Sequence, residues 1–124
     1  HVKVGDFAII GGLAAIKQFV RIGAHAIIGG MAGVESDVIP YGMVIGERGW
    51  LNGLNMVGMK RRGFSKEAIQ KIQDAYMNIF FDSELPLSQR ISSVKEKYQM
   101  DDDLKALMEF FDLPFNSLCQ PRAG

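Results

Sequence analysis

The side chains of this 124-residue sequence that could carry chemistry are few, and the most concentrated of them are basic. Lys60, Arg61 and Arg62 form one run at the entrance to a helix-like segment. An arginine suits a pyrophosphate because its planar guanidinium can donate two hydrogen bonds at once. Taken alone, such a run is more typical of a solvated charge cluster than of a phosphate site.

The two histidines and the single cysteine are the other candidates. A histidine titrates near neutral pH, which suits a general base. However, a solvated or interface residue also explains His25, and a chain end explains His1. Cys119 has no partner for an internal disulfide, so it fits a reducing compartment or a secreted chain without disulfides.

Charge and hydropathy disfavour two classes of protein. Fourteen Lys and Arg balance 14 Asp and Glu, so the chain lacks the positive field of a nucleic-acid binder. The basic run also has no aromatic platform beside it on which bases could stack. No apolar stretch reaches the roughly 18 to 20 residues that span a membrane, and no signal peptide is visible. We therefore expect no nucleic-acid partner and no transmembrane segment.

The elements that must position these residues begin with a repeat of six residues. Its aliphatic members are Val4, Ile10, Ile16, Ile22, Ile28 and Val34. A small or β-branched residue stands four places after each of them, and glycine directly follows four of the six. A fixed short period marks a solenoid, and hexapeptide repeats specify a parallel β-helix.

In such a β-helix, three short strands joined by sharp corners make one coil, and stacked coils pair about 4.8 Å apart. We expect the aliphatic residue to point inward, the residue four places later to lie near a corner, and the glycine to permit the tight turn. Six hexapeptides make only two coils, whereas repeat proteins generally need three or more units. Because the first hexapeptide is already regular, we expect earlier coils to precede His1 in the full protein.

The composition changes near residue 63 and divides the chain into two parts. Thirteen of the 14 glycines lie in residues 1–63, whereas most charged residues follow residue 59. Pro40 cannot donate a main-chain hydrogen bond, so we expect the stacked coils to stop there and irregular turns with short strands to follow. We predict the last coils and a connecting segment over 1–63, and a helical domain over 64–124.

Three amphipathic helices are predicted in the second part from caps and apolar periodicity. The first covers about 66–81 with Ser65 as its N-cap, and the second covers about 87–98. Asp101 or Asp102 caps the third. Their apolar faces predict a small antiparallel bundle that packs against the solenoid end or a neighbouring subunit. We expect the C-terminal tail to be extended or frayed.

Several stretches together resemble a known family. They are HVKVGDFAIIGG, QF at 18 and 19, IGAHAIIGG and NGLNMVGMKRRGFSKEAI. The hexapeptides alone would identify only a superfamily, but KRRGFS after a hexapeptide array is more specific. From His1 to about Phe81 the chain resembles the C-terminal half of the UDP-N-acetylglucosamine acyltransferases. The resemblance implies a mainly β plus α fold, in which a left-handed parallel β-helix precedes a C-terminal helical module, and assembly as a homotrimer.

The resemblance also implies a cytoplasmic enzyme that begins lipid A biosynthesis. Members transfer a (3R)-3-hydroxyacyl group from acyl carrier protein to the 3-hydroxyl of UDP-N-acetylglucosamine, with no cofactor, metal or covalent intermediate. A histidine is the general base. By comparison with the family it should lie about one coil before His1, so we expect no catalytic residue within this chain.

Three positions of the first hexapeptides match substrate contacts of the family. His1 matches a histidine that helps to position substrate, and Gln18 matches a glutamine near the acyl chain, although a buried structural amide also explains Gln18. Gly30 matches the position that sets acyl-chain length, because a side chain there would block the acyl groove. His25 would form part of the groove wall, and Lys17 replaces an active-site histidine of some members.

A second group of residues matches nucleotide-binding positions of the family. They are Asn55, Arg61 and Arg62. Val57 stands where some members have an acidic residue, so no contact is carried over to it. Two other functions fit the sequence: the N-acyltransferase that acts on UDP-3-O-acylglucosamine, and a trimerising solenoid fragment without chemistry. The KRRGFS stretch favours the O-acyltransferase.

Overall fold

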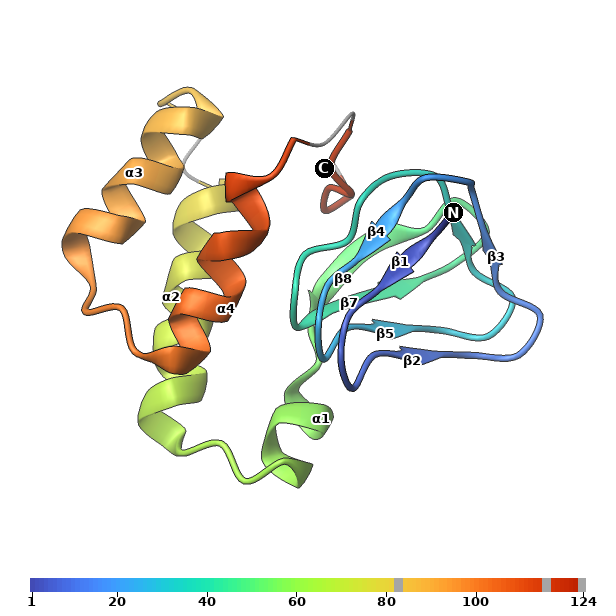
Figure 1. Cartoon of the computed structure of the whole chain (residues 1–124), viewed down its shortest axis with the longest axis horizontal. Coiled ribbons are helices and arrows are strands. Elements are labelled where there is room, and N and C mark those ends of the chain that lie inside the picture. The colour runs from blue at the N-terminus through green and yellow to red at the C-terminus, as the bar shows by residue number, and fades with distance from the viewer. Residues whose placement is uncertain (82–83, 115–116, 123–124) are drawn as a thin grey trace.

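The computed structural model describes residues 1–81, 84–114 and 117–122. Coils of short strands form one side of the molecule and helices form the other (Figure 1). The strands are β1 (Lys3–Val4), β2 (Ile9–Ile10), β3 (Ala15–Ile16), β4 (Arg21–Ile22), β5 (Ile27–Ile28), β6 (Gly33–Val34), β7 (Gly42–Ile45) and β8 (Trp50–Leu54). Among the described residues, none of the helices has the length and hydropathy of a membrane span.

The first six strands stack as the six-residue period predicts. β1 pairs in parallel with β4, β2 with β5, and β3 with β6. Each pairing joins residues one coil apart, such as Ile9 with Ile27. The aliphatic residues Ile22, Ile28 and Val34 are buried inside the coils, as predicted. The aliphatic repeat residues of the first coil, such as Val4, are more exposed. The first coil pairs with the second coil on one side, and no described strand stacks on its opposite side.

The corners correct the prediction about glycine. Non-glycine residues take the left-handed conformation at the fourth position of five successive hexapeptides, with φ between 60° and 67°. They are Phe7, Leu13, Phe19, His25 and Met31. The glycine two places before them has a different purpose. A Cβ on Gly11 would lie 2.5 Å from the backbone nitrogen of Gly30, so glycine is needed because the next coil passes too close.

The stacking does not end at Pro40, and that prediction was wrong. β7 pairs in parallel with β5, with Ile27 opposite Met43, and β8 then returns antiparallel to β7. The backbone N–H of Tyr41 also donates to the carbonyl of Ala24 at 2.9 Å. Pro40 lies against Gly23, outside the paired strands, where its missing N–H costs no strand hydrogen bond.

In the described residues, four α-helices and one 3-10 turn follow the strands. They are α1 (Met56–Arg61), α2 (Lys66–Phe81), α3 (Leu87–Lys97), α4 (Asp102–Glu109) and the 3-10 turn η1 (Phe110–Asp112). The three predicted helices are confirmed, and α1 is an additional one. Ser65 caps α2 through its hydroxyl, which accepts from the N–H of Ala68 at 3.1 Å. Asp101 caps α4 in the same way, accepting from Leu104 at 2.9 Å. α2 packs against both α3 and α4.

The helical part is joined to the coils through Arg21. Its guanidinium donates to the carbonyls of Phe110 and Leu113, at 3.0 and 3.3 Å, and lies 4.1 Å from the centre of the Phe110 ring. Asp37, only 6% exposed, accepts from the backbone N–H of Arg21 at 2.9 Å and lies 3.7 Å from its Nε. Arg21, paired with Asp37, thus holds the end of α4 against the coils.

The tail is extended, as expected, but its described part is not frayed. The N–H of Asp37 donates to Ser117, and the N–H of Cys119 donates to Asp37, at 3.0 and 2.7 Å. Leu51 donates to Gln120 at 2.9 Å. Residues 117–121 therefore run beside the last coil and β8, with the side chains of Leu118 and Cys119 buried.

Candidate functional site

Aromatic rings line up at one corner of the coils. Phe7, His25 and Tyr41 occupy this corner in successive coils, each with φ between 61° and 67°. Because the backbone repeats the same conformation, the rings stack, with centroids 5.0 Å apart for Phe7 and His25 and 5.3 Å apart for His25 and Tyr41. Phe64 meets both His25 and Tyr41 edge-on. We call Phe7, His25 and Tyr41 the histidine corner.

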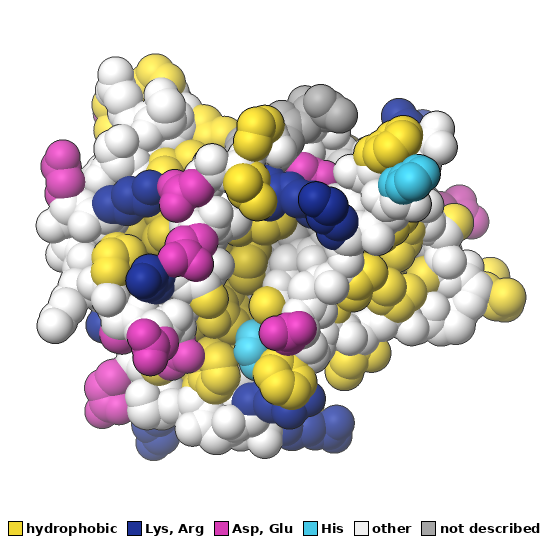
Figure 2. All heavy atoms as spheres, viewed as in Figure 1, with side chains coloured by type: hydrophobic (Ala, Val, Ile, Leu, Met, Phe, Trp, Pro, Cys, Tyr) yellow, Lys and Arg dark blue, Asp and Glu magenta, His cyan; other side chains and the backbone are white. Residues whose placement is uncertain are grey.

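A hollow of about 320 Å³ opens beside the histidine corner. Its lining residues are Phe7, Ile9, His25, Asn55, Gly58, Arg61 and Arg62. The structure therefore brings together the three predicted nucleotide-binding residues. They come from the segment around α1, which passes below the coils between the strands and α2 (Figure 1). On the face shown in Figure 2, Lys and Arg side chains gather below one of the two histidines.

The two arginines stand at the end of α1 and in the turn before α2. Arg61 is the last residue of α1 and Arg62 is its C-cap, whose N–H donates to Gly58 at 3.0 Å. The guanidinium carbon of Arg62 lies 3.6 Å from the centre of the Phe7 ring. Within the described part of the chain, neither arginine has a carboxylate within ion-pair distance. Both cations are therefore available to an anion.

Asn55 connects α1 to the histidine corner. Its side chain is buried, accepts from the N–H of Gly58 at 3.0 Å and donates to the carbonyl of His25 at 2.9 Å. It thereby caps α1. A Cβ on Gly58 would lie 2.7 Å from the Asn55 side-chain carbon, so glycine at this position makes the cap possible. An amide has two donor and two acceptor positions, which leaves one of each for a ligand.

The surroundings of the His25 imidazole favour its neutral form. Burial lowers its pKa, and the nearby charge of Arg62 lowers it further, while Asp103 and Asp6 act in the opposite direction. Both neighbours in the stack, Phe7 and Tyr41, are aromatic. The surroundings of His25 are thus those of a packing residue on the wall of the hollow.

The other three predicted site residues lie at the two remaining corners of the coils, away from the histidine corner. The His1 ring stacks on Phe19, with centroids 5.3 Å apart and planes at 6°, so His1 and the neighbouring Gln18 share one corner. Gln18 is exposed in this single chain, and both its role beside the acyl chain and the alternative of a structural amide stay predictions. Gly30 is exposed at the remaining corner, where the N–H of Met31 donates to a carbonyl of the previous coil. These positions do not reach the hollow beside Asn55.

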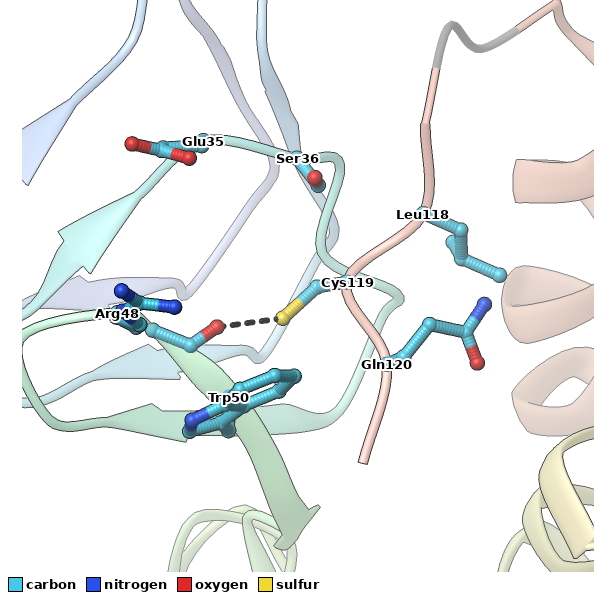
Figure 3. A pocket seen from close by; sticks show the side chains of 8 residues that line it. Glu35, Ser36, Arg48, Trp50, Leu118, Cys119 and Gln120 are labelled. Atoms are coloured by element: carbon cyan, nitrogen blue, oxygen red, sulfur yellow. Dashed lines mark hydrogen bonds between the residues drawn. The ribbon is translucent and has the colours of Figure 1, made fainter. Parts of the chain in front are cut away.

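A larger hollow, of about 480 Å³, lies where the tail crosses the last coil (Figure 3). Its lining residues are Glu35, Ser36, Arg48, Gly49, Trp50, Leu118, Cys119 and Gln120. The Cys119 thiol points to the carbonyl of Gly49, to which it donates at 2.9 Å. Burial raises its pKa to about 11, so the thiol stays protonated and is no nucleophile at neutral pH. None of the predicted site residues lines this hollow.

Several residues that shape the site were not singled out in the sequence. Phe7, Tyr41 and Phe64 belong to the aromatic cluster around His25. The spacing of Phe7 and His25, one coil apart, was a usable signal, because equivalent positions of stacked coils lie directly above one another. Among the described residues, no group of three or more His, Cys, Asp or Glu could hold a metal ion.

Known proteins resemble this chain in sequence and in fold. The family model described as UDP N-acetylglucosamine O-acyltransferase, domain 2, matches residues 37–118. An acyl-(acyl-carrier-protein)–UDP-N-acetylglucosamine O-acyltransferase of Rhizobium rhizogenes is 43% identical over 112 residues, which cover 90% of this chain and 40% of the relative. The corresponding protein of Paracoccus denitrificans is 53% identical over 74 residues, covering 60% of this chain and 28% of the relative.

Solved structures of such acyltransferases are similar to this chain in fold. The UDP-N-acetylglucosamine acyltransferase from Campylobacter jejuni superposes with a TM-score of 0.86 at 29% identity, over 98% of this chain and 47% of that one. The Arabidopsis enzyme gives 0.86 at 31% identity, over 97% and 45%. The chain spans less than half the length of these relatives. It belongs to the UDP-N-acetylglucosamine O-acyltransferase family.

Proposed function

We propose that this chain serves the transfer of a (3R)-3-hydroxyacyl group from acyl carrier protein to the 3-hydroxyl of UDP-N-acetylglucosamine, the first step of lipid A biosynthesis. The names of the relatives give the donor and the acceptor. The observation that carries the proposal is the hollow beside the histidine corner. It gathers Arg61 and Arg62, with no carboxylate paired to them in the described structure, around the buried Asn55.

In this proposal the hollow binds the nucleotide part of the acceptor. The guanidiniums of Arg61 and Arg62 donate charge-assisted hydrogen bonds to the diphosphate, whose oxygens they match in geometry. Asn55 holds α1 against the coils and so fixes the place from which both arginines extend. The volume of about 320 Å³ falls at the lower end of ordinary small-molecule sites.

The histidines of this chain have other tasks than proton transfer. His25 lies within an aromatic stack between Phe7 and Tyr41, so we assign it to the wall of the site. His1 stays a prediction as a residue that positions substrate. A general-base histidine about one coil before His1, and a cytoplasmic location, also stay predictions.

The distribution of the predicted residues favours a site made by more than one chain. The turns of a coil are closed by hydrogen bonds from Ala8 to Gly5, from Ala14 to Gly11 and from Val20 to Lys17. These three turns define three corners.

His1 with Gln18, Gly30, and the nucleotide hollow each lie at a different corner. Corners of one coil cannot meet, so one site containing all of them needs a neighbouring chain. We therefore include in the proposal a homotrimer of left-handed coils with acyl-transfer sites between chains. Light scattering of the full-length gene product should give three times the mass of one chain, and a monomeric mass would contradict the shared site.

Substitution of the arginines tests the nucleotide assignment. Arg61→Ala and Arg62→Ala in the full-length gene product should each raise the KM for UDP-N-acetylglucosamine about tenfold or more, since hydrogen bonds to charged groups contribute about 1.5–3 kcal/mol. The KM for the acyl donor should change little. Arg48→Ala is the matched control, because Arg48 lines the other hollow. An unaltered nucleotide KM in both arginine variants would refute the assignment.

The choice of acceptor separates this function from its two alternatives. Transfer to UDP-N-acetylglucosamine supports the O-acyltransferase. Transfer only to the glucosamine nucleotide that already carries an acyl group on its 3-hydroxyl would identify the N-acyltransferase instead. A trimer that binds neither nucleotide would be a solenoid without chemistry.

A further inference from the structure

We propose that Phe7 is a positioning residue, whose ring holds the Arg62 guanidinium in place to receive the diphosphate of the nucleotide. The inference rests on the proposed function, since it concerns how the same hollow binds its anion. Phe7 belongs to the first coil and was not among the predicted substrate-binding residues.

The geometry joins the coils to the basic turn through this ring. The guanidinium carbon of Arg62 lies 3.6 Å from the centre of the Phe7 ring, well within the range of a cation–π contact. The same ring stacks on His25, which in turn stacks on Tyr41. Arg62 therefore rests on a column of rings anchored in successive coils and does not extend freely into solvent.

Phe7 occupies a strained corner of the first coil, beside Arg62. The side chain is 53% exposed, and its backbone has φ of 61°, where a residue with a Cβ is strained. A contact with the cation of Arg62 gives the exposed part of the ring a partner.

The neighbouring arginine provides the comparison. Among the described residues, the cation–π contacts involve Arg21, Arg62 and Lys97, and none involves Arg61. A guanidinium that stacks on a ring uses its face, while its N–H donors project from the edge. Arg62 is thus held in one region with donors available, whereas Arg61 must be ordered when the anion binds. Ordering a long side chain in advance lowers the entropic cost of binding.

The test is a double-mutant cycle read out by calorimetric titration of the full-length gene product with UDP. Phe7→Leu removes the aromatic face, and Phe7→Tyr keeps it. Each change is made in the original protein and in Arg62→Ala. Phe81→Leu is the matched control, since Phe81 is 52% exposed, packs against Tyr76 on α2 and does not line the hollow. Phe7→Met replaces Phe7→Leu if the latter does not fold.

Phe7→Leu should weaken UDP binding about two- to fivefold, the range of a partly exposed cation–π contact. Phe7→Tyr should restore the Kd, and Phe7→Leu should have no further effect in the Arg62→Ala protein. The inference is overturned if Phe7→Leu leaves the Kd unchanged, if it acts equally without Arg62, or if Phe81→Leu weakens binding as much. Arg62→Ala alone tests the proposed function, because an unchanged Kd in that variant would remove the arginine from the site whatever Phe7 does.

Discussion

Gly30 is the single residue that we expect to set the length of the acyl donor. Its backbone is not in the left-handed region, and a Cβ built on it would lie 3.3 Å from the carbonyl oxygen of Gly12. A neighbour must therefore move by only a few tenths of an ångström to admit a side chain. Because Gly30 is exposed at its corner, a larger residue would project from the coils and would not disturb their interior.

Gly30→Met should accordingly shorten the preferred acyl donor and leave the fold intact. Each methylene that the new side chain excludes from an apolar groove costs about 0.8 kcal/mol, or about fourfold in relative kcat/KM. Gly30→Ala should give an intermediate shift. Competition between acyl donors of different length measures the effect in the full-length gene product. If the variant keeps its melting temperature and its preference for acyl-chain length is unchanged, the assignment of Gly30 to the acyl groove is wrong.

The residues of the site were predictable where a short motif names them and not where folding brings them together. Arg61 and Arg62 follow from KRRGFS, and the structure gathers them with Asn55. The stack of Phe7 on His25 was not predicted. The repeat is defined by the aliphatic and the small position of each hexapeptide, and both rings stand at a position between these two. Tyr41 could not be assigned, because Pro40 falsely suggested that the coils had ended.

Helix α4 illustrates the electrostatics of a single element. The Lys71 ammonium is the main cause of a lowered Asp101 pKa, and the backbone N–H of Leu104 contributes next. Lys71 lies 2.6 Å from the Asp101 carboxylate, whose side chain is 41% exposed, so solvent screens much of the attraction. Asp101 thus joins α2 to the start of α4 as well as capping it.

Asp101→Asn should separate the cap from the charge, because asparagine is an equally good N-cap. A lowered folded-state pKa means that the charge stabilises the protein above the unfolded value and that this stability is lost as pH falls through the folded value. The variant should be about 0.5 kcal/mol less stable at pH 7. Its stability should fall less between about pH 4 and 2.

Urea titrations at several pH values measure both effects. Asp102→Asn is the control, since no ion pair of Asp102 is recorded in the described structure. If the free energy of unfolding of Asp101→Asn falls as steeply in acid as that of the original protein, the predicted role of the Asp101 charge is wrong.

Local signals account for the elements that the sequence predicted well. The bounds of α2 and α3 agree closely with the prediction because caps and apolar periodicity lie within each helix. α1 was missed because it has only 6 residues and depends on the Asn55 cap and on its contact with the coils. β7 depends on β5, a partner far away in the sequence. The division of the chain at residue 63 stays a prediction.

At the scale of the whole molecule, Arg21, paired with Asp37, is one link between the coils and the helices. Arg21→Met would leave the Asp37 carboxylate, which is 6% exposed, without its cation. Removing one partner of a buried pair costs about 3 kcal/mol or more. We expect a loss of that size in the free energy of unfolding, measured by urea denaturation. Lys95→Met breaks the exposed pair with Asp112 and should cost less than about 1 kcal/mol. Equal losses in both variants would show that Arg21 is no special link.

The docking of the tail also sets the order in which the molecule can be completed. Asp37 exchanges backbone hydrogen bonds with Ser117 and Cys119, and Leu51 bonds with Gln120. A ribosome makes the chain from its N-terminus, so the partners of Asp37 and Leu51 emerge only after all the helices. The helices depend on near neighbours and can form early, whereas contacts between distant positions form slowly. The edge of the last coil therefore stays open until residues 117–120 have left the ribosome.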